Sequence, residues 1–318
     1  MTKSPGYCPL CGQGLVEKGE EILIADVFKA WISLHQFSPE VVRQHAALSP
    51  STRLYQCSGC ALEIFLPPVI GQPSFYRELQ QDARFAYYRD DKWDFREAVK
   101  DTRGCQAVME IGCGPGNFLA LVKPRLRDVR GIETNRHARN EARAKGLTVY
   151  GDEYDPRRLA GSFDAVFSFH VLEHVADPLA FIEQMLLLAK PDGKICISVP
   201  DQDGPLRHLG RSVMNMPPHH ATRWRLKTFR ALANRLNLRV ARVAREPLLL
   251  ENQNYYSDYW LHAVMPGNAF WQRKMRAAAA LLMSKFFALW KRLGCKRFVL
   301  LRGQAIYVVM HRRSRRTG

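Results

Sequence analysis

The chain has 318 residues, of which 47% are hydrophobic and 24% charged, a composition typical of a globular protein rather than a disordered one. We find neither a run of ~18 apolar residues nor an apolar secretory core, so we expect a cytoplasmic protein without a membrane span. The net charge of +17 is concentrated in residues 207–318, which hold 23 Lys and Arg against 3 Asp and Glu. This asymmetry favours an anionic partner, with a solvated basic face as the alternative.

Two Cys-x-x-Cys pairs stand near the start of the chain, Cys8 with Cys11 and Cys57 with Cys60. Each pair places two thiolates on a tight turn, and two such turns supply the four ligands of a tetrahedral zinc site. We therefore predict a zinc-ribbon-like module over residues 1–66 with a structural zinc, from which residues 13–56 loop out. Independent redox pairs are the alternative. The aromatic and charged residues 67–104 predict a helical linker.

Apolar strands alternate with helical segments from residue 107 onward. The predicted strands are residues 107–111, 128–133, 147–150, 163–169, 194–199, 238–245 and 304–311. Helices are predicted at 117–127, 135–145, 178–189 and 227–236. This alternation predicts a parallel sheet covered on both faces, in a domain spanning residues 105–318. The last strand is expected to be antiparallel at the sheet edge, after an insertion at about 248–302.

A glycine loop follows the first predicted strand, in the run Glu110-Ile111-Gly112-Cys113-Gly114-Pro115-Gly116-Asn117. Its glycines permit a tight turn and let a ligand approach the backbone. Glu133 ends the second strand, where a carboxylate can accept hydrogen bonds from ribose hydroxyls. Glu110 would repel a pyrophosphate, but it suits a ligand with a cationic amino group.

These motifs, followed in order by Ser162-Phe163-Asp164-Ala165-Val166, Phe169-His170-Val171-Leu172-Glu173-His174-Val175 and Leu188-Ala189-Lys190-Pro191-Asp192-Gly193, resemble class I S-adenosylmethionine-dependent methyltransferases. The resemblance implies a Rossmann-like fold with a mostly parallel seven-stranded sheet. It implies that Glu110 and the loop hold the methionine part, that Glu133 binds the ribose, and that the adenine lies near Asp152 and Glu153. The predicted cofactor-binding set is Glu110, Gly112, Cys113, Gly114, Gly116, Asn117, Glu133, Asp152, Glu153, Phe169 and His170.

Two groups of histidines are candidates for work on the methyl acceptor. His219 and His220 follow the fifth strand, on the ligand side of an open sheet, and we predict that they contact the acceptor, one of them as the base. Capping of the next helix is the alternative. Glu173 and His174 resemble the Glu-His pair of quinone-pathway O-methyltransferases, whose acidic neighbours can bind a divalent metal. Because Phe169 and His170 stand where those enzymes have a further carboxylate, we expect Glu173 and His174 to fix the loop instead.

Residues 268–293 predict an amphipathic helix. Its apolar face carries Trp271, Met275, Ala278, Leu282, Phe286, Leu289 and Leu293, with basic residues opposite. We favour packing of this face on the domain; the alternatives are dimerisation and contact with the inner face of the membrane.

The function predicted is methyl transfer from S-adenosyl-L-methionine to a small-molecule, sugar or lipid-linked acceptor, at oxygen. One alternative is an RNA methyltransferase that uses the basic C-terminal third, although no recognised RNA-binding module accompanies it. Another is a non-enzymatic binding protein that retains the fold.

Overall fold

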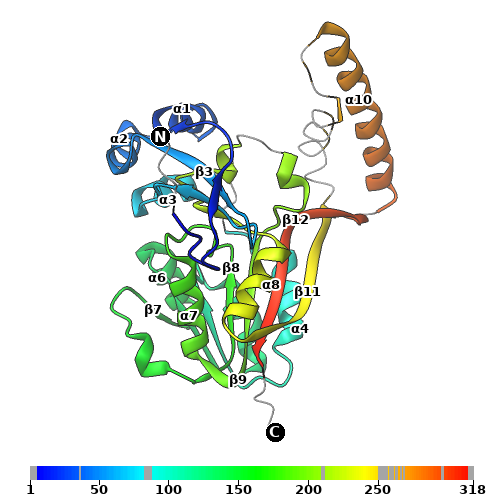
Figure 1. Ribbon diagram of the computed structural model, residues 1–318. Coiled ribbons are helices and arrows are strands. Elements are labelled where there is room, and N and C mark those ends of the chain that lie inside the picture. Colours follow the sequence, from blue (N-terminus) through cyan, green and yellow to red (C-terminus); the bar gives the residue numbers. More distant parts are fainter. Residues whose placement is uncertain are drawn as a thin grey trace.

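A seven-stranded sheet forms the centre of the protein (Figure 1). The computed structural model describes residues 6–35, 37–81, 88–208, 212–249, 257, 261, 264–265, 267, 269–294 and 297–313. The strand order is β11-β12-β9-β8-β5-β6-β7. The strands are β5 (Ala107–Ile111), β6 (Asp128–Ile132), β7 (Thr148–Tyr150), β8 (Phe163–Phe169), β9 (Ala189–Pro200), β11 (Leu238–Leu249) and β12 (Arg297–Arg312).

Strands β5 to β9 pair in parallel, and β12 is antiparallel to both β9 and β11. The predicted Rossmann-like, mostly parallel seven-stranded sheet is therefore confirmed. The antiparallel direction of the last strand is confirmed too, but its place at the edge is wrong. β12 lies between β9 and β11, so β11 is the edge strand.

Helices cover both faces of the sheet. They are α4 (Trp93–Asp101), α5 (Asn117–Val122), α6 (Arg136–Ala144), α7 (Pro178–Leu188) and α8 (Leu226–Arg235). Residues of α4, α5 and α6 share one apolar core with Tyr307 and Val309 of β12, whereas residues of α7 and α8 share the other core with Ile306 and Val308. Successive side chains of a strand point to opposite faces, so this division places the two helical layers on opposite sides.

Local sequence signals define where these helices start. Asn135 caps α6 by accepting hydrogen bonds from the backbone N–H groups of His137 and Ala138. Asp177 caps α7 in the same way, and Pro178 occupies the first turn, where its missing N–H costs nothing. Such caps satisfy backbone donors that the first turn of a helix leaves without partners.

The N-terminal region forms a second sheet and its own helices. Its elements are β1 (Leu15–Glu17), β2 (Ile22–Leu23), α1 (Ile24–His35), α2 (Pro39–Leu48), β3 (Ser51–Cys57), β4 (Glu63–Leu66) and α3 (Pro73–Gln81). The segment expected to loop out thus contains two helices, whose apolar residues pack around Trp31 and Phe75. β4 pairs with β10 (Thr222–Arg223), which follows β9 in the main domain. The two regions therefore share a sheet.

The insertion before β12 contains α10 (Phe270–Arg292), which projects from the body of the molecule (Figure 1). Phe287 of α10 is buried against Leu248 of β11, with Met283 and Trp290 beside them. The apolar face predicted from the sequence points elsewhere, since Trp271, Leu282 and Leu289 are 60%, 68% and 58% exposed. The expectation that this face packs on the domain is therefore wrong. Among the described helices, none is long and apolar enough to cross a membrane.

Candidate active site

A cavity of about 1120 Å³ opens where the parallel strands end. Its walls come from the glycine loop after β5, the ends of β6, β8 and β9, residues 70–80 and 88–95 before the sheet, and the loop that carries His219 and His220. Ligands of open α/β sheets bind at this edge, outside the carboxyl ends of the strands. The fold therefore brings the predicted cofactor loop and the predicted acceptor histidines to one cavity.

The glycine loop has the shape expected of a cofactor cradle. Gly112 and Gly114 adopt left-handed φ angles of 74° and 52°. A Cβ atom on Gly114 would lie 2.6 Å from the Tyr88 ring, and one on Gly112 would overlap the Val171 side chain. Both positions thus require glycine for conformation and for space.

Two buried carboxyl groups flank this loop. Both Glu133 oxygens accept backbone hydrogen bonds, one from Gly114 N–H and one from Asn135 N–H, each at 2.7 Å. Each carboxylate oxygen keeps a second acceptor site, so Glu133 can still receive hydroxyl donors. Burial raises the pKa of Glu110 well above its ordinary value, and its Oε2 accepts no hydrogen bond within the described residues. A buried acceptor of this kind suits a cationic ligand.

His170 is held between two acidic side chains. Its Nε2 lies 3.1 Å from Asp94 Oδ2, and its Nδ1 lies 3.4 Å from Glu173 Oε1. Burial lowers the pKa of His170, but the hydrogen bonds and charges of Asp94 and Glu173 outweigh it and raise that pKa to about 9. The ring is therefore cationic at neutral pH. This ion pair joins α4 to the loop after β8, and His170 lines the cavity.

Three further histidines form a cluster in the same cavity. One ring nitrogen from each of His174, His219 and His220 lies within 4.8 Å of the others. The rings of His219 and His220 stack with centroids 4.5 Å apart. Tyr76 of α3 reaches the cluster through a 3.2 Å contact between its hydroxyl and His174 Nδ1. The predicted acceptor residues are thus joined by His174 and covered by the N-terminal region.

Most residues of the predicted cofactor set line the cavity. Those that do are Glu110, Gly112, Cys113, Gly114, Asn117, Glu133, Asp152, Phe169 and His170. Gly116 and Glu153 lie outside the wall. Gly116 instead permits α5 to approach α6, because a Cβ atom there would meet Leu147 and Ala142. Glu153 accepts a hydrogen bond from Gly151 N–H at 3.1 Å and lies 3.7 Å from Arg143.

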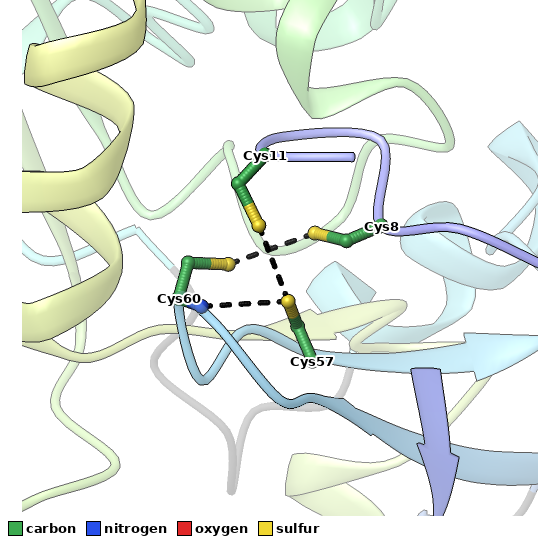
Figure 2. Close-up of side chains that lie close together, drawn as sticks. All are labelled: Cys8, Cys11, Cys57 and Cys60. Atoms are coloured by element: carbon green, nitrogen blue, oxygen red, sulfur yellow. Dashed lines mark hydrogen bonds between the residues drawn. The ribbon is translucent and has the colours of Figure 1, made fainter. Parts of the chain in front are cut away.

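The four predicted zinc ligands converge (Figure 2), and none of them lines this cavity. The Sγ atoms of Cys8 and Cys60 are 3.6 Å apart, and those of Cys11 and Cys57 are 3.3 Å apart. Four thiolates about 2.3 Å from a tetrahedral zinc would lie about 3.8 Å from one another. The donor set and its spacing therefore fit a zinc ion.

Sequence reasoning missed the wall formed by residues 70–80 and 88–95, which belong to the segment predicted as a linker. Tyr76, Tyr88 and Lys92 line the cavity, and Asp94 pairs with His170. The density of aromatic and charged residues in this segment was a signal, because a solvent-exposed linker has no need of several large rings. Their partners are far along the chain, however, and only the folded structure identifies them.

Comparison with known proteins places the chain in a family. The family described as a methyltransferase domain matches residues 80–243, about half of the chain, and the protein belongs to it. The glycine loop, the buried carboxyl groups and the sheet topology agree with this membership.

Curated relatives match part of the chain. A ubiquinone biosynthesis O-methyltransferase of Xanthomonas oryzae is 35% identical over 114 residues, covering 33% of this chain and 47% of its own. An uncharacterized methyltransferase of a Mycobacterium species is 32% identical over 127 residues, covering 39% of this chain and 49% of its own. The chain thus spans about half the length of the curated relatives it matches. Among solved structures, a putative methyltransferase from Bacillus halodurans aligns with 69% of this chain and 98% of its own, at 12% identity and a TM-score of 0.47.

Proposed function

We propose that the protein transfers a methyl group from S-adenosylmethionine to an oxygen atom of a small-molecule, sugar or lipid-linked acceptor. One observation carries the proposal: the cofactor loop and the histidine cluster line a single cavity. Methyl transfer is an in-line displacement, so the acceptor oxygen must approach the methyl carbon opposite the sulfur. A cavity that holds both reactants in one line supplies much of the rate.

The cofactor fits the half of the cavity around the glycine loop. Its ammonium group would lie at Glu110 and its ribose hydroxyls at Glu133, whose oxygens retain acceptor capacity. Asp152, which also lines the cavity, would lie near the adenine. The acidic lining suits a ligand that carries both an ammonium and a sulfonium charge.

The acceptor fits the other half, beside Tyr76, His174, His219 and His220. Leu206 and Met214 add apolar surface there, which suits a ring or a lipid-linked group. Relatives named as ubiquinone biosynthesis O-methyltransferases support oxygen as the methylated atom. The role of His219 or His220 as the general base stays a prediction.

A structural zinc at Cys8, Cys11, Cys57 and Cys60 is part of the proposal. The hydrogen bond from Cys60 is the main cause that lowers the pKa of the Cys8 thiol to about 5. Thiolate is the form that binds metal. The cluster adjoins the main core, so the ion would hold the N-terminal region against the catalytic domain.

We also propose that α10 docks on the anionic inner face of the cytoplasmic membrane. Its exposed face carries Trp271, Leu282, Phe286 and Leu289, which are 50–68% exposed. The helix has six Lys and Arg and no Asp or Glu. Apolar side chains beside unopposed positive charge are the pattern of a helix lying in an anionic lipid interface.

Sedimentation with liposomes tests this docking. The wild type should pellet with phosphatidylserine-containing vesicles and much less with neutral ones, and Leu282→Glu should reduce the bound fraction. The control is Leu187→Glu on α7, because Leu187 is also exposed, at 40%, but lies on another helix. Equal sedimentation of wild type and Leu282→Glu would contradict the docking.

Calorimetry tests the central proposal. Titration of S-adenosylmethionine into the wild type should show one binding site, and Glu133→Ala should weaken it at least tenfold. Glu141→Ala, on the exposed face of α6, should bind as the wild type does. A folded wild type that does not bind would refute the cofactor assignment. Binding lost equally in both variants would refute the role of Glu133.

A further inference from the structure

The three-histidine cluster has the hydrogen bonds of a metal site. Each ring presents its Nδ1 to an oxygen: His174 to the His219 carbonyl, His219 to the Met214 carbonyl at 3.1 Å, and His220 to Asn215 Oδ1 at 3.1 Å. A carbonyl oxygen cannot donate, so Nδ1 must carry the proton in the first two rings. The amide nitrogen of Asn215 donates to Gln202, which fixes Oδ1 as the acceptor for His220.

This pattern determines the tautomer of all three rings. When Nδ1 holds the proton in a neutral imidazole, Nε2 carries the lone pair. Metal-binding histidines almost always donate their second ring nitrogen to a carbonyl or carboxylate, which orients the ring and raises its basicity as a ligand. Two buried rings and one partly buried ring, fixed in this way and with one ring nitrogen of each within 4.8 Å of the others, make a pre-oriented donor set.

Glu173 is the second, independent observation. Its side chain is 2% exposed, and its ion-pair contacts within the described residues are long ones to two histidine rings. Its Oε1 lies 3.4 Å from His170 Nδ1 and 3.8 Å from His174 Nε2. A buried carboxylate is costly unless a cation or donor faces it. Because His170 is shared with Asp94, a cation at the histidine cluster would give the Glu173 carboxylate a second positive charge nearby.

We propose that His174, His219 and His220 bind a divalent transition-metal ion of the zinc class, distinct from the zinc proposed at the four cysteines. Imidazole donors suit Zn²⁺, Co²⁺, Ni²⁺ and Fe²⁺ better than Mg²⁺ or Ca²⁺. Three protein ligands leave a coordination position open, as in sites where a metal polarises an oxygen. Here the open position faces the cavity, where an acceptor hydroxyl can occupy it. That role at the acceptor rests on the proposed function; the binding of the ion does not.

Metal binding and the predicted base exclude each other. A ligated imidazole has no lone pair left for a proton, so His219 and His220 cannot hold the ion and also deprotonate the acceptor. The ion would instead orient the acceptor oxygen and lower the pKa of its hydroxyl.

The test counts metal in the full-length, untagged protein. After dialysis against zinc, the wild type should hold two equivalents by mass spectrometry, and His219→Gln/His220→Gln should hold one. X-ray absorption should show sulfur neighbours at about 2.3 Å together with nitrogen neighbours at about 2.0–2.1 Å in the wild type, and sulfur alone in the variant. His137→Gln, at a ring that is 81% exposed on α6, is the matched control and should retain two.

A second variant tests the site independently in case the double variant misfolds. His174→Gln changes a ring that is only partly buried and should also drop to one equivalent. With zinc removed from both proteins, its unfolding midpoint should equal that of the wild type. One all-sulfur zinc in the wild type, or a second zinc that survives both substitutions, would overturn the proposal. Calorimetry with S-adenosylmethionine separates this outcome from failure of the proposed function, since cofactor binding does not use these rings.

Discussion

Glu63 joins the N-terminal region to the catalytic domain through a buried ion network. Its side chain is 0% exposed and lies 2.6 Å from Lys18 Nζ and 3.4 Å from the Arg223 guanidinium, with Arg225 also in contact. Arg223 is only 8% exposed. The substitution Glu63→Gln keeps the shape but removes the charge, and so leaves Arg223 buried without its counter-ion. Breaking a buried pair from one side costs about 3–5 kcal/mol.

We therefore expect Glu63→Gln to lower the free energy of unfolding by about 3 kcal/mol. Urea denaturation followed by tryptophan fluorescence measures it, since Trp31 and Trp224 are both fully buried, one in each region. Glu17→Gln is the control, because Glu17 pairs with Arg53 at 2.6 Å but is 40% exposed; its loss should cost less than about 1 kcal/mol.

The pH dependence provides a check on the same network. Burial raises the pKa of Glu63, but Lys18, Arg223 and Arg225 outweigh it and hold that pKa below its ordinary value of 4.5. The stabilisation from its charge is thus complete above about pH 4.5 and is lost as the pH falls through the folded-state pKa. The gap between wild type and Glu63→Gln should narrow on acidification. A cost no larger than that of Glu17→Gln, or separate unfolding of the N-terminal region alone, would refute the reasoning.

Three further outcomes follow from the structure. Gly114→Ala should weaken S-adenosylmethionine binding about tenfold in calorimetry, because φ of 52° and the 2.6 Å approach to Tyr88 both oppose a Cβ atom; unchanged affinity would contradict the cradle. Cys57→Ser/Cys60→Ser should release one zinc and lower the free energy of unfolding by about 4 kcal/mol or more, measured by metal analysis and denaturation; a variant of wild-type stability would argue against a structural ion. Asp164→Asn should lower the free energy of unfolding by about 2 kcal/mol at neutral pH and by progressively less in acid. The reason is that Lys190 and two backbone N–H groups outweigh burial and lower the pKa of Asp164. A loss of stability that does not change with pH would contradict this.

Burial on both faces explains which strands could be predicted. β5 and β8 were predicted with the observed bounds, since each is a short apolar run covered by helices. The predicted edge position of β12 was wrong, although the sequence held a signal: residues Ala305 to Met310 are all apolar, and all are buried in the structure. A run that is apolar at six successive positions belongs between two neighbours, because an edge or one-sided strand alternates. Strand order depends on pairing between distant segments, which local patterns do not encode.

Within the site, too, local patterns could be predicted and contacts between distant segments could not. The glycine loop and Glu133 were recognisable because their spacing is local to one strand–loop–helix–strand unit. Asp94 was not, because its partner His170 stands 76 residues later and only the sheet brings α4 beside the loop after β8. The lack of packing on the predicted face of α10 was also beyond the sequence, since an amphipathic pattern marks an apolar face without naming what covers it.

The N-terminal region holds the loop that carries His219 and His220. The backbone N–H of Ala221 donates to the Glu173 carbonyl at 2.8 Å, and the Ala221 carbonyl accepts from Phe65 N–H at 3.0 Å. Thr228 Oγ1 donates to the Cys60 carbonyl at 3.0 Å, which ties α8 to the cysteine cluster. The loop with His219 and His220 is therefore fixed between the end of β8 and the cysteine-bearing sheet. Loosening that sheet should displace the acceptor half of the cavity before the cofactor half, whose main contacts come from β5 and β6.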